Sequence, residues 1–461
     1  MSHVETAEDL MRAHSDSFGL HVTGPVGALA GINWYHTCLI TYQRWELWGE
    51  ILVTAKAFPK SVMANLLAGD FAQQQLGGVG PGGDKFLNAA EGITCLSKRE
   101  KGYLKALRAS ANRDLRGAYE AWLEVVKAFP TDLFAVKRGQ FTCIMTENPL
   151  GILEIAQAAE LSDSPLGRYY GGMLVFGLQQ TGDMEGAERE AIRALKVEAA
   201  AKVSQPDLFE DGWLHHGLAL VYHAQNKSEE AITFLSAHCS QWRREALHPY
   251  LFTHLWWHLV LLHVMSGNYE MALELFDAEL WAGADEFDME VQINAIDVLL
   301  RLHLRGVQDL DKRWDAVLDS IERAPKMPTT LPPYPLFYLL KLAALCVRGR
   351  PAAAQWLHEI HKEAERTPIV MKMHLPLAQA LVTLLAPARP EEMSAKQASA
   401  ASAKATIMGL KGEHGWKEVM GNEQQRSFLR EVANANVDMP PAGPRGMGRL
   451  CTIPDDTCVL M

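Results

Sequence analysis

The chain has 461 residues, of which 48% are hydrophobic, and a formal net charge of -11. Such a chain can bury a large core, and its acidic balance argues against nucleic acid as a partner, because phosphate binding needs a basic face. Its seven cysteines include no CxxC pair, which argues against a structural zinc site and favours buried thiols in a reducing compartment. No apolar run reaches the roughly 20 residues of a membrane span, so we expect a cytoplasmic protein.

The polar and acidic N-terminus does not resemble a secretory signal peptide, and we expect residues 1–19 to be flexible. From residue 20 to residue 432, apolar residues recur at intervals of three and four, which predicts helices. The alternating pattern of a strand is not found. The expected fold class is therefore all-α, with either a large bundle or a solenoid as its architecture.

Four turn motifs favour the solenoid. Each begins with a small or polar pair and places an alanine a few residues later, as at the turn between the helices of a tetratricopeptide unit. These motifs are Asn112–Ala118, Gly182–Ala187, Asn226–Ala231 and Gly267–Ala272. Further helical hairpins are expected over 291–321, 336–365 and 375–410. We therefore predict an α-solenoid of divergent tetratricopeptide (helix-turn-helix) repeats over residues 20–432.

Two of the predicted first helices carry histidine and tryptophan together. The segments are His254-Leu-Trp-Trp-His258, which leads to Gly267-Asn-Tyr-Glu-Met-Ala-Leu, and Trp213-Leu-His-His216-Gly-Leu-Ala. With Asp132-Leu-Phe-Ala-Val-Lys137 and Leu375–Val382, they resemble the tetratricopeptide repeat protein 38 family from about residue 24 to residue 433. The resemblance implies a repeat solenoid and no particular activity. Members of that family often carry further histidines and a glutamate where this chain has Leu220, Tyr222 and His223.

In such a solenoid, the first helix of each unit lines the concave face. Counting back from the turn alanines places aromatic and imidazole side chains on that face, and these could hold a peptide or a small ligand. The alternative is that the same large side chains simply fill the inner surface of a tight superhelix. The candidates are Tyr169, Phe176, Trp213, His216, His223, His254, Trp257 and His258.

A metal site is a further alternative. His254 and His258 are four residues apart, so both project from one face of a helix, and His216 could supply a third ligand. No glutamate follows His254 in the manner of a zinc protease motif. Histidines on apolar helices are more often buried and hydrogen-bonded than ligating, so we favour no metal and expect no cofactor.

Residues 433–461 lose the helical pattern and become rich in proline and glycine, which predicts a disordered tail. The chain ends Cys458-Val-Leu-Met, a sequence that predicts farnesylation of Cys458, and Cys451 is a candidate for palmitoylation. One lipid gives only marginal membrane binding, so we expect at most peripheral association with membranes.

The favoured function is an interaction scaffold or adaptor that binds a segment of a partner protein in the concave groove. The alternative is an enzyme, or a protein that binds a small ligand or metal, acting through the histidine and tryptophan cluster. The sequence carries no nucleophile triad or dinucleotide fingerprint that would favour a known enzyme class.

Overall fold

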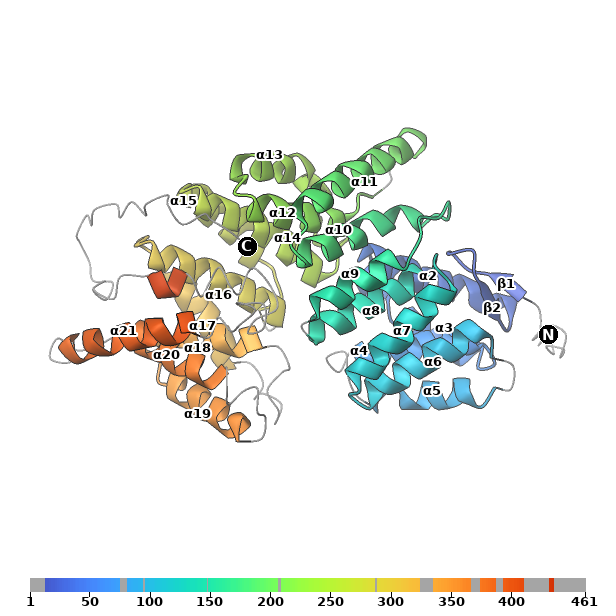
Figure 1. Cartoon of the computed structure of the whole chain (residues 1–461), viewed down its shortest axis with the longest axis horizontal. Helices are drawn as coiled ribbons and strands as arrows, with labels where there is room; N and C mark the ends of the chain where they lie inside the picture. The colour runs from blue at the N-terminus through green and yellow to red at the C-terminus, as the bar shows by residue number, and fades with distance from the viewer. Residues whose placement is uncertain are drawn as a thin grey trace. The chain divides into compact units, whose positions relative to one another are not determined.

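The computed structural model describes residues 13–74, 81–93, 96–146, 148–205, 209–286, 288–323, 335–365, 374–386, 393–409 and 431–434. The described chain is almost entirely helical, so the all-α fold class is confirmed (Figure 1). It forms two compact units, residues 1–255 and 256–461. None of the described helices combines the length and the apolar character that crossing a bilayer requires.

The first unit opens with a short hairpin of β1 (Ala13–Ser15) and β2 (His21–Thr23), which pair antiparallel. This differs from the expectation of a flexible segment over residues 1–19 and of a chain without strands. Asp16 and Phe18, in the turn of the hairpin, are buried. The strands are too short to show an alternating pattern, and long-range side-chain contacts hold them in place. Residues 1–12 lie outside the described part of the chain.

The helices of the first unit follow the hairpin in chain order. They are α2 (Leu29–Thr41), α3 (Glu50–Ala57), α4 (Val62–Gln74), α5 (Asp84–Glu91), α6 (Lys98–Ala111), α7 (Leu115–Ala128), α8 (Leu133–Met145), α9 (Pro149–Gln157), α10 (Tyr170–Gln180), α11 (Met184–Ser204), α12 (Gly212–Ala224) and α13 (Ser228–His238). Helix α14 (Pro249–Met265) contains the division between the units, between Leu255 and Trp256.

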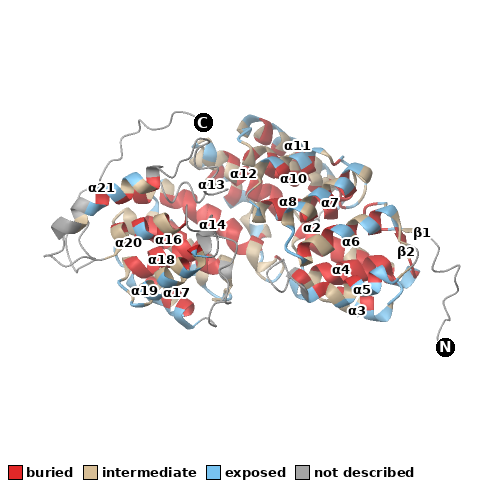
Figure 2. Ribbon diagram, turned by 60° about the horizontal axis from the view of Figure 1, so that its bottom comes forward, coloured by how far each residue is buried: buried red, intermediate tan, exposed pale blue. Residues whose placement is uncertain are grey.

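The second unit continues with α15 (Tyr269–Leu275), which runs into a π-helical turn, η6 (Phe276–Trp281). The remaining helices are α16 (Met289–Leu304), α17 (Asp311–Arg323), α18 (Pro335–Val347), α19 (Ala352–Ala364), α20 (Leu375–Leu385) and α21 (Met393–Gly409). The three further hairpins predicted in this region correspond to the pairs α16–α17, α18–α19 and α20–α21. Each unit has its own hydrophobic core, and buried residues follow the inner sides of its helices (Figure 2).

All four predicted turns join two helices, and two more turns share the same geometry. In each, one residue has a left-handed backbone, and the N–H of the next residue donates to the carbonyl five positions earlier. This is the Schellman arrangement that closes a helix. The left-handed residues are Arg113, Gly182, Asn226, Gly267, Gly306 and Gly349. The alanines that the four motifs predicted at the start of the second helix are fully buried: Ala118, Ala187, Ala231 and Ala272.

In three of these turns, one residue both ends the first helix and caps the second. Asp114 and Asp183 accept side-chain hydrogen bonds from the N–H groups of Gly117 and Gly186, and Asn268 accepts one from Met271. A capping side chain satisfies an N–H that the new helix leaves without a partner. The reversal therefore needs almost no loop, and the two helices pack directly against each other.

Candidate functional site

Four of the side chains predicted to line a groove meet in the first unit. Phe176 lies on α10, Trp213 and His216 on α12, and His254 on α14. The ring centroids of Trp213 and His216 are 4.6 Å apart, those of Phe176 and Trp213 5.0 Å, and those of His216 and His254 4.9 Å. All four side chains are buried. Four of the residues selected by counting from the turn alanines therefore lie together, in the interior rather than on an open surface.

Two further candidates, Tyr169 and His223, lie outside this group. Tyr169 is buried beside Arg168, just before α10, and His223 is half-buried in the last turn of α12. Trp257 and His258 belong to the second unit, although His258 follows His254 by one turn of α14. The indole N–H of Trp257 donates to Asp297 Oδ2 at 3.0 Å, inside the core of that unit.

A buried lysine packs against this aromatic cluster. Lys137, on α8, is only 6% exposed. Its Nζ lies 4.2 Å from the centre of the Tyr42 ring and 4.1 Å from that of the Trp213 ring. The two rings are nearly parallel, with centroids 5.7 Å apart. Aromatic faces attract a cation, but they do not replace the hydrogen bonds of water. Within the described part of the chain, Nζ has no hydrogen-bond partner.

Tyr42 is held in an unusual backbone conformation. It ends α2 with φ of 57°, and Arg44 follows with φ of 48°. Bulky residues rarely adopt this region, and such strain persists only where surrounding contacts impose it. Backbone hydrogen bonds between residues 42–44 and 246–248 hold this conformation. The N–H of His248 donates to the Tyr42 carbonyl, and the N–H of Arg44 donates to the Ala246 carbonyl at 2.8 Å. The Tyr42 ring also stacks on Tyr250.

Asp211 lies at the start of α12, and its charge influences the pKa of Lys137. Its Oδ1 accepts the N–H of Trp213 at 3.0 Å, and its own N–H donates to Glu198 at 2.6 Å. The other carboxylate oxygen, Oδ2, is buried and has no hydrogen-bond partner among the described residues. The same holds for the indole Nε1 of Trp213. We call Lys137, Asp211, Trp213 and Tyr42 together the lysine cage.

Burial shifts the pKa of both ionisable groups of the cage, Lys137 and Asp211, in the direction of the uncharged form. Burial lowers the pKa of Lys137, and the charge of Asp211 only partly opposes this. Burial likewise raises the pKa of Asp211, against the charges of Lys137 and Arg168. Burial also lowers the pKa of His216, and the nearby charges of His254 and Lys137 act in the same direction. The cage therefore presents the Lys137 amine and the Trp213 indole N–H, which can each donate a new hydrogen bond.

A second polar cluster, around Glu210, lies near the same end of α12, just before its first residue. Its Oε2 is 2.6 Å from His238 Nδ1 and 3.5 Å from His215 Nε2, and the three ligand atoms lie within 4.8 Å of one another. The indole N–H of Trp242 donates to His215 Nδ1 at 3.2 Å. Because an indole only donates, Nδ1 holds the lone pair and the proton of the neutral ring is on Nε2.

This assignment disfavours a metal at Glu210. A metal ligand needs its lone pair on the atom that faces the ion, and His215 faces Glu210 with a protonated Nε2. Lys202 also forms an ion pair with the same carboxylate. The cluster is better described as a hydrogen-bonded anchor that joins α11, α12 and α13. The metal hypothesis for His216, His254 and His258 stays a prediction.

The sequence reasoning found the histidines and tryptophans of the site but not the cage itself. Lysine is almost never buried without a partner, so Lys137 in an apolar helix is normally expected to reach solvent. Tyr42 is 171 residues before Trp213, and no local pattern links the two. The one available signal is Asp211, a residue type that commonly caps helices, two residues before Trp213.

The fold and the site define an all-helical protein with a recurring helical hairpin, whose first unit holds a buried amine between two aromatic rings. No family model matches the chain, and no solved structure matches it.

Proposed function

We propose that the protein binds a small molecule in the lysine cage of its first unit. The observation that carries this proposal is the Nζ of Lys137, which is buried between two aromatic faces without a hydrogen-bond partner among the described residues. Leaving a buried polar group without a hydrogen bond costs about 1–3 kcal/mol. A ligand that supplies the acceptor recovers this cost, so the cage is suited to binding rather than to packing alone.

The chemistry of the cage indicates the kind of ligand. Lys137 Nζ and Trp213 Nε1 are both donors, so they suit an oxygen acceptor such as a carboxylate or a carbonyl. The side chains around the amine are largely aromatic, which suits an apolar body. We therefore infer a small molecule that carries a carboxylate or carbonyl group on an apolar skeleton.

Calorimetric titration of the full-length protein with benzoate and hexanoate tests the proposal. Lys137→Met should weaken binding by at least about tenfold, because a hydrogen bond to a charged group contributes about 1.5–3 kcal/mol. The matched control is Lys341→Met: Lys341 is also buried, in the second unit, with its Nζ 5.6 Å from the Trp356 ring centre. Equal affinities for the two variants would contradict the proposal.

We also propose that the helical hairpins are tetratricopeptide-type repeats stacked in a solenoid, related to the tetratricopeptide repeat protein 38 family. Six copies of one turn support this, and so do the contacts of α10 with α12, α16 with α18, and α18 with α20. Repeat arrays present extended surfaces to partners. Binding of a protein segment is therefore the second candidate function. Migration of the protein only at its monomer mass in extracts of its own cells would argue against it.

Membrane association stays a prediction, since Cys451 and Cys458 lie outside the described part of the chain. The intact mass of the protein from a eukaryotic cell, beside a Cys458→Ser control, tests it. A farnesyl-sized increment that is absent from the control would support prenylation.

A further inference from the structure

We propose that the face of α16 around Arg301 and Arg305 is a recognition site for an acidic peptide segment, and that residues 431–434 of the chain itself occupy this site in the absence of a partner. The partner that fits is a protein segment in which a glutamate precedes small apolar residues. The site belongs to the second unit and does not involve the lysine cage, which belongs to the first.

Two arginines on successive turns of α16 form the charged half of the site. The side chain of Arg301 is fully buried, and that of Arg305 is 21% exposed. Arg301 Nε donates to Asp297 Oδ2 at 2.9 Å, on the preceding turn of the same helix. Asp297 thus balances one of the two positive charges. Because buried charges are normally paired, a second carboxylate is favoured at this face.

Glu431 supplies the second carboxylate from a distant part of the chain. Its Oε1 forms an ion pair with Arg301 Nη1, and its Oε2 lies 2.5 Å from Arg305 Nη1. Each carboxylate oxygen therefore contacts a different guanidinium, and charge-assisted hydrogen bonds of this kind are among the stronger ones in proteins. Burial raises the pKa of Glu431, but the charges of Arg301 and Arg305 outweigh burial and hold this pKa below its ordinary value.

The two residues after Glu431 form the apolar half of the contact. Val432 is 1% exposed and Ala433 is 6% exposed, and both belong to the hydrophobic core of the second unit. Residues 431–434 make a single helical turn, and one turn is not stable by itself in water. The position of this turn therefore depends on the glutamate between the two arginines and on the burial of the two small side chains.

A short segment held in this way can be exchanged for another segment of the same chemistry. A docked part of the chain behaves as a tethered ligand, and tethered ligands act at effective concentrations on the order of millimolar. A partner that offers the same carboxylate and apolar side chains binds by displacing residues 431–434. Weakening the chain's own segment should therefore raise the apparent affinity for a partner, because the site is open in a larger fraction of the molecules.

The test uses a fluorescein-labelled peptide of residues 425–436, and fluorescence anisotropy follows its binding to the full-length protein. Glu431→Gln weakens the chain's own contact and leaves both arginines in place. This variant should bind the glutamate peptide at least about tenfold more tightly than the wild-type protein does. It should bind a second peptide, with glutamine in place of the glutamate, at least about tenfold more weakly than the first.

The matched control is Glu286→Gln. This substitution removes another ion pair of the second unit, to Arg323 at 2.9 Å, beyond the opposite end of α16. The control variant should bind the glutamate peptide as the wild-type protein does. Equal affinities of the Glu431→Gln and Glu286→Gln variants for this peptide, or equal affinities of the Glu431→Gln variant for the two peptides, would overturn the inference.

A measurement on the wild-type protein covers the case in which Glu431→Gln does not fold. Isotopically labelled peptide is added at about 5 mM, in the range of the effective concentration of a tethered segment. Mass spectrometry then follows hydrogen exchange in the proteolytic fragment that contains residues 431–434. The glutamate peptide should accelerate this exchange and the glutamine peptide should not. Unchanged exchange in the presence of the glutamate peptide would contradict the inference, whereas the benzoate titration tests the lysine cage separately.

Discussion

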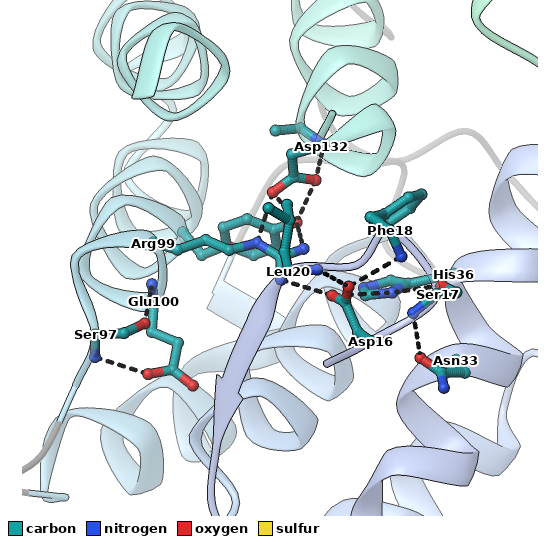
Figure 3. A network of polar contacts seen from close by, with 12 residues as sticks. Asp16, Ser17, Phe18, Leu20, Asn33, His36, Ser97, Arg99, Glu100 and Asp132 are labelled. Carbon is teal, nitrogen blue, oxygen red and sulfur yellow. Dashed lines mark hydrogen bonds and ion pairs between the residues drawn. The ribbon is translucent and has the colours of Figure 1, made fainter. Parts of the chain in front are cut away.

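The guanidinium of Arg99 lies 2.6 Å from the carboxylate of Asp16, although 83 residues separate them in the chain (Figure 3). Both side chains are essentially inaccessible to solvent. The same guanidinium lies 2.7 Å from Asp132, at the start of α8. Arg99 thereby attaches the N-terminal hairpin to α6 and α8, and Asp16 completes the turn by accepting the N–H groups of Phe18 and Leu20.

Replacing Arg99 with Met should destabilise the first unit by about 3–5 kcal/mol, because it leaves two buried carboxylates without their cation. The matched control is Arg108→Met, which removes ion pairs to Asp84 and Glu91 that are partly exposed. Such pairs contribute about 0–1 kcal/mol. Urea unfolding followed by tryptophan fluorescence measures both losses, and equal losses would show that the buried network contributes no more than a surface pair.

The pH dependence of stability should carry a contribution from His36. Burial lowers the pKa of this histidine to about 3, and the charge of Arg99 acts in the same direction. The unfolded chain therefore takes up the proton first. The stability that His36 contributes is fully present above about pH 6.5 and is lost as the pH falls from there towards 3.

Between pH 7.5 and pH 5.5, His36 alone should account for about 1.4 kcal/mol of lost stability. His36→Gln should lose less than the wild-type protein by about that amount over the same interval. His21→Gln, at an exposed position of β2, is the control. Urea unfolding at the two pH values gives the comparison, and parallel losses in the wild-type and His36→Gln proteins would contradict the assignment.

Substitution of Trp257 tests whether this side chain serves packing or ligand binding in the second unit. Its side chain is 1% exposed and donates to Asp297. Trp257→Ala should therefore cost about 3–5 kcal/mol, as expected for a large aromatic side chain lost from a core. Trp45→Ala, at a 43% exposed position, should cost far less. Thermal melting of both variants checks this, and an unchanged melting temperature for Trp257→Ala would instead support the groove hypothesis for this residue.

The helical hairpins could be predicted from the sequence because their information is local. A left-handed residue, a capping aspartate or asparagine and a buried alanine lie within six positions of one another, as from Gly182 to Ala187. These residue types fit the backbone that the turn requires, so the position of the turn can be predicted from the local sequence.

The parts that could not be predicted depend on contacts between distant residues. The strands of the N-terminal hairpin are three residues long, and Arg99 determines their place. In the same way, Lys137 lies on an apolar helix, and its buried position depends on Tyr42 and Trp213, which are distant from it in the sequence. Sequence periodicity predicts which face of a helix is buried, but it does not predict which polar residues are buried as well.

The short pairing between Tyr42 and His248, and between Gln43 and Leu247, has a consequence for biosynthesis. Tyr42 leaves the ribosome about 200 residues before its partner, so the early helices can pack while one wall of the lysine cage still lacks its backbone support. The cage is completed only when the start of α14 has emerged. A nascent chain arrested before residue 246 should therefore contain folded helices and yet hold no ligand.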